Sequence, residues 1–377
     1  MVCYFTKPID MKLLLTVICF LISAACFAQS KKSNVFIITT DGFRWEELFN
    51  GADSSLINNS NYVKDTSLTK QMFWDISDNL RRQKLMPFFW NVIAKKGQLF
   101  GNRNLDNKVN VKNLYKISYP GYNEILTGYA DPIPILNAPV QNRNYNVLEF
   151  LNKQSAFKGK VAAFSSWNIM PYIFNEERSG FTVNSGYEML NDKNELSEMI
   201  DSVQKNARKS KTRNDGLTYL SAKEYIEQHH PKVLFLGLGE TDECAHEGRY
   251  DLYLQKAAAF DKMVADLWYY IQTDPFYKDN TSLIITTDHG RGKKGKDWRT
   301  HGFWIKGSGE TWMAMMGPEI LPEGEINIPQ QIWQKQIAAT IATLAGENFV
   351  TKQHSIAPSI NIAVQPSAAI MYTTKVL

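Results

Sequence analysis

The fold is decided by a stretch that reads Leu283-Ile-Ile-Thr-Thr-Asp-His-Gly290, an apolar run followed at once by two polar side chains and a glycine. A short apolar run rich in β-branched residues is typical of a strand buried on both faces of a sheet. Four more runs have the same character, at residues 35–40, 161–164, 233–238 and 313–316. We expect all five to be buried, parallel strands.

Helical patterns separate these runs. The clearest covers residues 249–272, where apolar side chains recur on one face, at Leu252, Ala259, Phe260, Met263, Val264, Leu267 and Ile271. A second helix is predicted over residues 329–344, ending before Gly346. Strands that alternate with helices indicate an α/β fold with a mostly parallel central sheet flanked by helices. Two polar stretches, residues 50–83 and 168–214, are interpreted as insertions over the functional edge of that sheet.

Length and composition fit one large domain over residues 29–377. The chain has 377 residues, of which 44% are hydrophobic and 21% charged, which is ordinary for a globular protein. The formal net charge of +4 is small and evenly spread, so the sequence shows no nucleic-acid-binding surface. The oligomeric state does not follow from the sequence.

The N-terminus resembles an export signal. Lys12 precedes an apolar run over residues 13–27, and small and polar residues follow. This pattern predicts a signal peptide over residues 1–28, hence a periplasmic or secreted protein, with no membrane span in the mature chain. Acylation at Cys26 is an alternative interpretation. Removal of the leader would leave Cys244 as the only cysteine, so no intramolecular disulfide is expected.

Metal-ligand side chains follow three of the predicted strands. Because parallel strands place their carboxyl ends at one edge of the sheet, these side chains should lie close together. Carboxylates and imidazoles are the ligands expected for zinc or a similar metal. A single aspartate at a strand end is often only a helix cap, but several such coincidences argue against that reading. The candidate ligands are Asp41, Asp242, His246, Asp288, His289 and His301.

Ser118 is the candidate nucleophile. It precedes a short helical segment with Pro120 near its first turn and Gly128 at its end. A serine in this position can simply cap the helix. The same position would also direct the positive end of the helix dipole at a phosphate attached to the serine.

These motifs resemble those of the alkaline phosphatase superfamily, and most closely its nucleotide pyrophosphatase/phosphodiesterase-like branch. The shared order is Asp-Gly after the first strand, Ser-x-Pro opening a helix that ends in Thr-Gly, Asp-x-x-x-His, Asp-His-Gly and finally His-Gly. In this chain the order runs through Asp41-Gly42, Ser118 to Gly128, Asp242 to His246, Asp288 to Gly290, and His301-Gly302, so the resemblance spans residues 34–346.

The resemblance implies two divalent metal ions, which we expect to be zinc. One would be held by Asp41, Asp288 and His289, with Ser118 as a further ligand, and the other by Asp242, His246 and His301. It also implies a phosphoserine intermediate on Ser118 and a small-molecule phosphate ester as substrate. An asparagine that holds a phosphate oxygen is expected about twenty residues after the nucleophile; Asn137 is our candidate and Asn142 the alternative. Gly121-Tyr122 and Glu240-Thr241 depart from the residues usual in that branch.

Several functions remain open at this stage. A sulfatase shares Ser-x-Pro, but its signature continues to an arginine where Tyr122 stands, and it uses calcium held by oxygen ligands. A manganese phosphomutase and a non-catalytic metal-dependent binding protein are further alternatives. Cations against a phosphate dianion would favour a monoesterase, and an aromatic slot would favour a diesterase, which is our preference. The candidates are Arg44, Lys160, Arg178 and Lys306 for the first, and Trp45, Trp167, Tyr172 and Phe174 for the second.

Overall fold

The computed structural model describes residues 33–190, 192, 194–207 and 210–364, and Ser33–Val364 forms one compact unit. The predicted leader, including Cys26, lies outside these residues. Within the described ranges, no helix is long and apolar enough to cross a bilayer.

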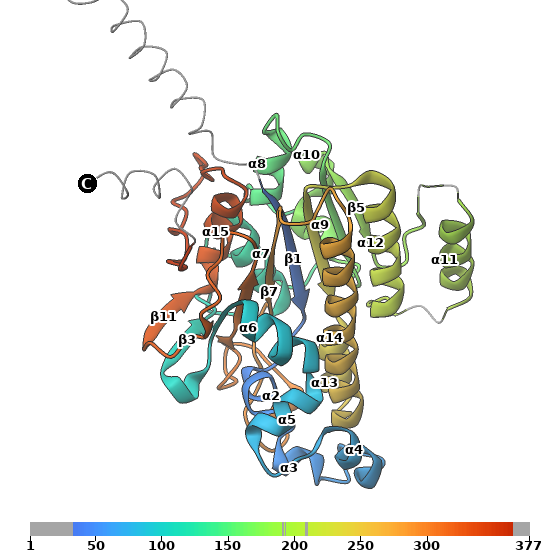
Figure 1. Cartoon of the computed structure of the whole chain (residues 1–377), viewed down its shortest axis with the longest axis vertical. Coiled ribbons are helices and arrows are strands. Elements are labelled where there is room, and N and C mark those ends of the chain that lie inside the picture. The colour runs from blue at the N-terminus through green and yellow to red at the C-terminus, as the bar shows by residue number, and fades with distance from the viewer. Residues whose placement is uncertain (1–32, 191, 193, 208–209, 365–377) are drawn as a thin grey trace, which may run out of the picture. The chain divides into compact units, whose positions relative to one another are not determined.

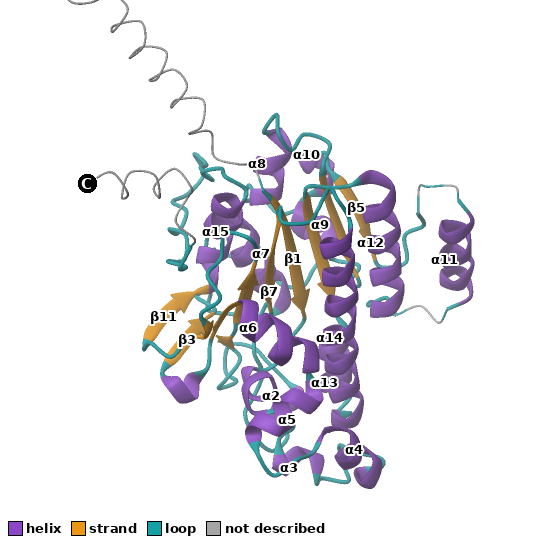
Figure 2. Ribbon diagram, viewed as in Figure 1, coloured by secondary structure: helices purple, strands orange, loops and turns teal. Residues whose placement is uncertain are grey.

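An eight-stranded sheet forms the centre of this unit, in the order β10-β2-β9-β7-β1-β6-β4-β5. Strand β1 lies between β6 and β7 and is parallel to both, and β4 and β5 continue the parallel part (Figure 2). The bounds are β1 Asn34–Thr40, β2 Gly97–Phe100, β4 Val161–Ser165, β5 Thr182–Ser185, β6 Val233–Leu238, β7 Thr281–Thr286, β9 Met313–Met316 and β10 Gly324–Glu325. The five predicted strands are therefore present.

The direction of β9 differs from the prediction. Met313–Met316 pairs antiparallel with both β7 and β2. A buried apolar run has the same composition in either direction, so the sequence pattern could not reveal this. Between β7 and β9 the chain forms loops, one short 3-10 helix (η3, Asp297–Arg299) and the two-residue strand β8, but no crossover helix, which a parallel connection normally requires.

A small second sheet corrects the helix predicted over residues 329–344. Its strands are β11 (Gln330–Trp333), β3 (Asn107–Asn110) and β8 (Glu310–Thr311), with β11 parallel to β3. A 3-10 turn, η4 (Gln334–Gln336), follows, and only Ile337–Leu344 is helical, as α15. Pairing with a distant strand overrides the local helical pattern of the first residues.

Helices cover both faces of the central sheet. Alternate side chains of β1 enter two separate cores: Phe36 and Ile38 pack in one, Val35 and Ile37 in the other. The first core includes side chains of α5, α12 and α14, and the second those of α7, α8 and α15. Figure 1 shows α14 running along the sheet. The helix bounds are α2 Trp45–Asn50, α3 Ser54–Ile57, α4 Thr66–Phe73, α5 Asp78–Leu85, η1 Phe89–Ile93, α6 Ala94–Lys96, η2 Arg103–Leu105, α7 Ser118–Thr127, α8 Val147–Lys153, α9 Met170–Phe174, α10 Glu176–Ser179, α11 Glu195–Asn206, α12 Asp215–His229, α13 Glu240–His246, α14 Tyr250–Thr273 and α15.

The two predicted insertions differ in character. Residues 50–83 form α3, α4 and part of α5, which lie at the bottom of Figure 1, and they bury apolar side chains in the first core. Residues 168–214, however, contribute β5, an edge strand of the central sheet. This second segment is therefore part of the sheet and does more than cover its edge. Its strand reads Thr182-Val-Asn-Ser185, which is too short and polar to be recognised by an apolar pattern.

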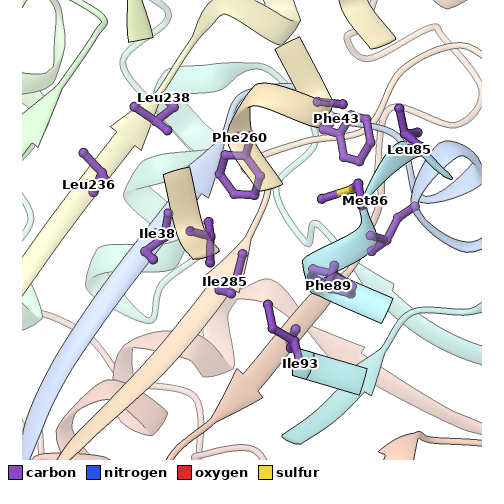
Figure 3. Close-up of a cluster of buried hydrophobic side chains, with 14 of the residues drawn as sticks. Ile38, Phe43, Leu85, Met86, Phe89, Ile93, Leu236, Leu238, Phe260 and Ile285 are labelled. Carbon is purple, nitrogen blue, oxygen red and sulfur yellow. The ribbon is translucent and has the colours of Figure 1, made fainter. Parts of the chain in front are cut away.

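Replacement of Phe260 tests the packing of α14 on the sheet. Its ring is 2% exposed and lies among Ile38, Leu236 and Ile285 (Figure 3). We expect Phe260→Ala to lower the free energy of unfolding by about 3–5 kcal/mol, because it removes buried surface and leaves a cavity. Tyr269→Ala on the same helix is the control, since Tyr269 is 68% exposed. Urea denaturation measures both; equal losses in the two variants would contradict this packing.

Candidate metal centre

The carboxyl ends of β1, β6 and β7 bring the predicted ligands together. Because β1 pairs in parallel register with both neighbours, Asp41, directly after it, lies between the loops that follow β6 and β7. The backbone N–H of Asp41 still donates to the carbonyl of Leu238 at 2.9 Å. Asp288 and His289 follow β7 by two and three residues, so they reach the same edge. The sheet therefore positions this centre directly.

Asp41, Asp288, His289 and Ser118 form a first group of donors. His289 Nε2 lies 3.3 Å from Asp41 Oδ1 and 3.4 Å from Asp288 Oδ2. Ser118 Oγ lies 3.2 Å from the same nitrogen. All four residues are buried. Their spacing matches ligands that share one ion, and the three acidic and imidazole members form one of the two groups of described residues able to hold a metal.

Asp242, His246 and His301, the three ligands predicted for the other ion, lie next to the first group. The second set of described residues that are close enough to hold one metal is Asp242, His289 and His301, with His289 in place of His246. Asp242 and His246 are four residues apart on α13, so both side chains project from one side of the helix. His246 Nε2 lies 3.1 Å from Asp242 Oδ2 and 3.1 Å from His301 Nε2. The ring of His301 stacks on that of His289 with centroids 3.8 Å apart. The six predicted ligands therefore make one continuous cluster.

Each carboxylate of the cluster has one oxygen engaged by the protein and one directed at the imidazoles. Asp288 Oδ1 accepts from the Gly42 N–H at 3.1 Å, and Asp41 Oδ2 accepts from the Tyr122 hydroxyl at 3.3 Å. The remaining oxygens, Asp41 Oδ1 and Asp288 Oδ2, are buried and have no hydrogen-bond partner among the described residues. Buried carboxylate oxygens normally have a donor or a cation. This is the arrangement that outer-shell donors give to metal ligands, so a cation fits here.

The histidines are oriented in the same way. His289 Nδ1 lies 2.9 Å from the carbonyl oxygen of Gly290, and His301 Nδ1 lies 3.3 Å from that of Lys116. Because a carbonyl only accepts, Nδ1 of both rings carries the proton, which leaves Nε2 as a lone pair facing the cluster. Lone pairs therefore converge from both carboxylates and imidazoles. Two divalent cations would complete this arrangement.

Burial is the largest cause of the pKa shifts of Asp41, Asp288 and His301. Burial, and then the charge of Asp242, raises the pKa of Asp41 well above its ordinary value. Burial and Asp41 raise the pKa of Asp288 in the same direction. Burial also lowers the pKa of His301, which favours the neutral ring that can act as a ligand. The protein thus concentrates acceptor groups in a place where their ionised forms need a cation.

Arg291 is a further residue of the site that the sequence patterns did not reveal. Its side chain is buried, and Nη1 donates to Asp242 Oδ1. Carbonyls of the turn at η3 fix the guanidinium: Nε donates to Trp298 at 2.9 Å and Nη2 to Arg299 at 2.6 Å. Although burial opposes ionisation of Asp242, the guanidinium holds the pKa of that carboxyl well below its usual range. Its position could have indicated a role at the site, because Arg291 directly follows the Asp288-His289-Gly290 motif.

Ser118 is the first residue of α7, and Ile117 occupies the N-cap position without a side-chain cap. The Ser118 hydroxyl is therefore not used to cap the helix and faces His289 instead. The departure at Gly121 has a steric reason, because a Cβ there would collide with the carbonyl oxygen of Asp288. The departure at Tyr122 supplies the hydroxyl that holds Asp41. Both residues thus fit α7 against the metal-ligand edge.

Asn137 and Asn142, the two candidates for phosphate binding, lie in different places. Asn137 lines a cavity of about 330 Å³ together with Ser118 and four of the predicted ligands, Asp41, Asp242, His246 and His301. Its Oδ1 accepts from the Tyr119 N–H at 2.8 Å. Asn142 is buried elsewhere, where its Nδ2 donates to Asn123 at 3.0 Å. The geometry therefore favours Asn137 for contact with a ligand in this cavity.

Of the cationic and aromatic side chains considered for substrate selection, only one lines this cavity. Arg44 and Arg178 form ion pairs with buried glutamates, and Lys160 donates to a backbone carbonyl. None of these three cations, nor Lys306, lines the cavity, whereas Lys211 does. Among the aromatic candidates Trp167 lines it, while Trp45 and Phe174 belong to the two cores and Tyr172 packs against the second.

A sequence pattern and several solved structures are similar to this chain. Residues 144–303 match the Metalloenzyme superfamily. This segment contains every predicted metal ligand except Asp41 and Ser118, together with Arg291. No curated protein sequence matches the chain.

The structural matches concern the fold. Alkaline phosphatase PafA matches with a TM-score of 0.57 at 10% identity, over 85% of this chain and 96% of PafA. Ps i-CgsB matches with a TM-score of 0.52 at 15% identity, over 87% and 75% of the two chains. The phosphonate monoester hydrolase of Agrobacterium radiobacter matches with a TM-score of 0.50 at 12% identity, over 83% and 74%. The predicted α/β class is thus confirmed, and the chain has the fold of alkaline phosphatase PafA.

Alanine variants of two glycines can separate damage to the ligand cluster from the effect of backbone strain. Gly42 and Gly159 both have positive φ, of 58° and 70°. A Cβ at Gly42 would lie 2.8 Å from both Arg291 Nη1 and Asp242 Oδ1, whereas a Cβ at Gly159 would have no neighbour within 4 Å. We expect both alanine variants to lose roughly 1–2 kcal/mol of stability from the left-handed backbone.

Only Gly42→Ala should also lower the content of bound zinc after dialysis, measured by elemental analysis of each purified protein. Equal zinc content in Gly42→Ala, Gly159→Ala and the unchanged protein would show that this cluster does not hold the metal.

Proposed function

We propose that this chain, which has the alkaline phosphatase fold, is a two-metal hydrolase of phosphate esters with Ser118 as its nucleophile. The observation that carries the proposal is the place of the Ser118 hydroxyl, 3.2 Å from His289 Nε2. The carboxylate oxygens that lack partners, Asp41 Oδ1 and Asp288 Oδ2, lie 3.3 and 3.4 Å from the same nitrogen. A nucleophile next to a set of metal ligands is the arrangement by which a serine hydroxyl is activated without a separate base.

Asp41, Asp288 and His289 would hold one ion with Ser118, and Asp242, His246 and His301 the other. Three imidazoles among the ligands favour zinc over calcium, which prefers oxygen ligands alone. Bound ions would supply Lewis acidity at the attacking and leaving oxygens of a phosphate ester. In this account Arg291 is a positioning residue, because it fixes the Asp242 oxygen that faces away from His246.

The reaction we propose has two displacements at phosphorus. In the first, Ser118 Oγ forms a bond to phosphorus, the bond from phosphorus to the leaving oxygen breaks, and the hydroxyl proton passes to solvent. In the second, water adds to the phosphoserine, the bond between Oγ and phosphorus breaks, and Ser118 regains its proton. The first turn of α7 directs its positive dipole end at the transferred group during both steps.

Asn137 would bind a non-bridging phosphate oxygen. The N–H of Tyr119 holds its Oδ1, which orients the side chain beside Ser118. No hydrogen bond among the described residues engages its Nδ2 group, so that amide can donate to the substrate.

A phosphodiester is the substrate class that the cavity supports best. Trp167 and Ile169 give one wall of the cavity apolar surface for a second ester group. Among the described residues that line the cavity, Lys211 is the one lysine, and no arginine lines it. A dianionic monoester would call for more cationic contacts than this. The sulfatase alternative is disfavoured by the imidazole ligands. We also propose that the enzyme is exported, on the basis of the leader predicted over residues 1–28.

Ser118→Ala tests the nucleophile. We expect turnover of bis-p-nitrophenyl phosphate to fall roughly 10³-fold or more, because the attacking oxygen is removed, while Ser355→Ala, in an exposed loop, keeps full activity. Initial rates on p-nitrophenyl phosphate and p-nitrophenyl sulfate, measured beside the diester, identify the substrate class. Undiminished diester turnover in Ser118→Ala would refute this role. Absence of turnover on all three esters by the unchanged protein would favour a non-catalytic binding protein.

A further inference from the structure

The rim of the cavity carries apolar side chains that the fold leaves in water. We propose that this rim docks on an anionic lipid surface, and that the ester cleaved at Ser118 is presented there as part of an amphiphilic molecule. The second half of the inference rests on the proposed function; the docking itself does not.

Two loops flank Ser118 and build this rim. On one side, His301 Nδ1 lies 3.3 Å from the carbonyl oxygen of Lys116, which ties the loop of residues 301–308 to the residues before Ser118. On the other side, the hydroxyl of Tyr119 donates to the carbonyl of Val140 at 2.7 Å, and Asn137 contacts the Tyr119 N–H. The loop of residues 131–140 is thereby tied to the residue after Ser118. Both loops therefore border the cavity that contains Ser118, to which they contribute His301, Asn137 and Pro139.

Both loops expose apolar side chains. Trp304 is 88% exposed and packs edge-on against Phe303, which is 44% exposed. On the other loop, Ile133 is 72% and Val140 52% exposed. Single exposed apolar residues are common, but a group of them around one cavity is typical of an interaction surface. Tryptophan in particular is favoured where water meets lipid, because its ring is apolar and its N–H is polar.

The charge of the same region indicates the partner. Residues 293–306 contain one carboxylate, Asp297, and five basic side chains, Lys293, Lys294, Lys296, Arg299 and Lys306. Lys293 pairs with Glu310 at 2.8 Å, and Arg299 donates to a backbone carbonyl at 3.1 Å. The other three lysines are exposed and make no ion pair with any described carboxylate.

Exposed lysines beside an exposed tryptophan complement an anionic membrane surface, which attracts cations and accepts aromatic rings at its interface. A second copy of this chain is a poorer partner, since the same three lysines would face each other across the contact. Docking in this way would hold the mouth of the cavity at the level of lipid phosphates.

Vesicle co-sedimentation tests the docking without any turnover. Residues 29–377 are used, because the apolar leader would itself bind lipid and the compact unit begins at Ser33. We expect binding to vesicles of phosphatidylglycerol and phosphatidylcholine, and at least tenfold weaker binding to phosphatidylcholine alone. The double variant Phe303→Ser/Trp304→Ser and the triple variant Lys294→Gln/Lys296→Gln/Lys306→Gln should each bind the anionic vesicles at least tenfold more weakly.

Matched controls lie away from the rim. Tyr269→Ser removes an aromatic ring that is 68% exposed on α14, and Lys158→Gln/Lys278→Gln/Lys352→Gln removes three exposed lysines. Both should bind like the unchanged protein. The docking is overturned if the unchanged protein stays in solution, or if the rim variants pellet as it does. It is also overturned if sedimentation velocity shows a dimer that Phe303→Ser/Trp304→Ser dissociates.

Hydrolysis of soluble bis-p-nitrophenyl phosphate separates the two proposals. A protein that cleaves this ester but ignores anionic vesicles contradicts only the docking. One that binds the vesicles through the rim but cleaves no phosphate ester contradicts the proposed function, and with it the amphiphilic substrate, and leaves the docking supported.

Discussion

This structure depends on one constraint: buried carboxylate and imidazole groups, all of them hydrogen-bond acceptors, face one another with no donor between them. Asp41 and Asp288 each direct a carboxylate oxygen without a hydrogen-bond partner towards His289, while Tyr122 and the Gly42 N–H engage their other oxygens. Burying such groups without compensation is costly, so the arrangement persists because something positive completes it. Arg291 supplies one charge at Asp242, and the two proposed divalent ions would supply the remainder.

The central sheet makes this crowding possible. Three adjacent parallel strands end at one edge, so ligands that are far apart in sequence converge without long, flexible loops. Helix α7 then adds Ser118, the proposed nucleophile, and the close approach of this helix depends on Gly121, which packs against the carbonyl of Asp288. Gln334 strengthens this junction, because its amide donates to the carbonyls of both Gly121 and Asp288. Strand β11 of the second sheet ends at Trp333, the residue before Gln334, so the second sheet helps to position Gln334 at the site.

The sequence predicted that these side chains would converge because five of the six candidate ligands come soon after an apolar strand, and such a strand fixes where its end must lie; His301 lies in a loop. It predicted poorly wherever long-range contacts decide. Residues 330–333 pair with a strand more than 200 residues away, so their helical pattern was misleading. The antiparallel direction of β9 has no signature in an apolar run. In the sequence Arg291 cannot be told from an ordinary surface arginine; its burial depends on the turn at η3, whose Trp298 carbonyl accepts from its Nε. Asn137 and Asn142 could not be separated because their loop lacks regular spacing.

Anomalous diffraction from crystals grown with zinc would locate the ions of the proposed two-metal centre. We expect two peaks, one among Asp41, Asp288 and His289 and within reach of Ser118 Oγ, the other among Asp242, His246 and His301. We also expect Arg291 to keep its contact with the Asp242 oxygen that faces away from His246. A single peak, or peaks bound only by residues outside this cluster, would contradict the two-metal centre.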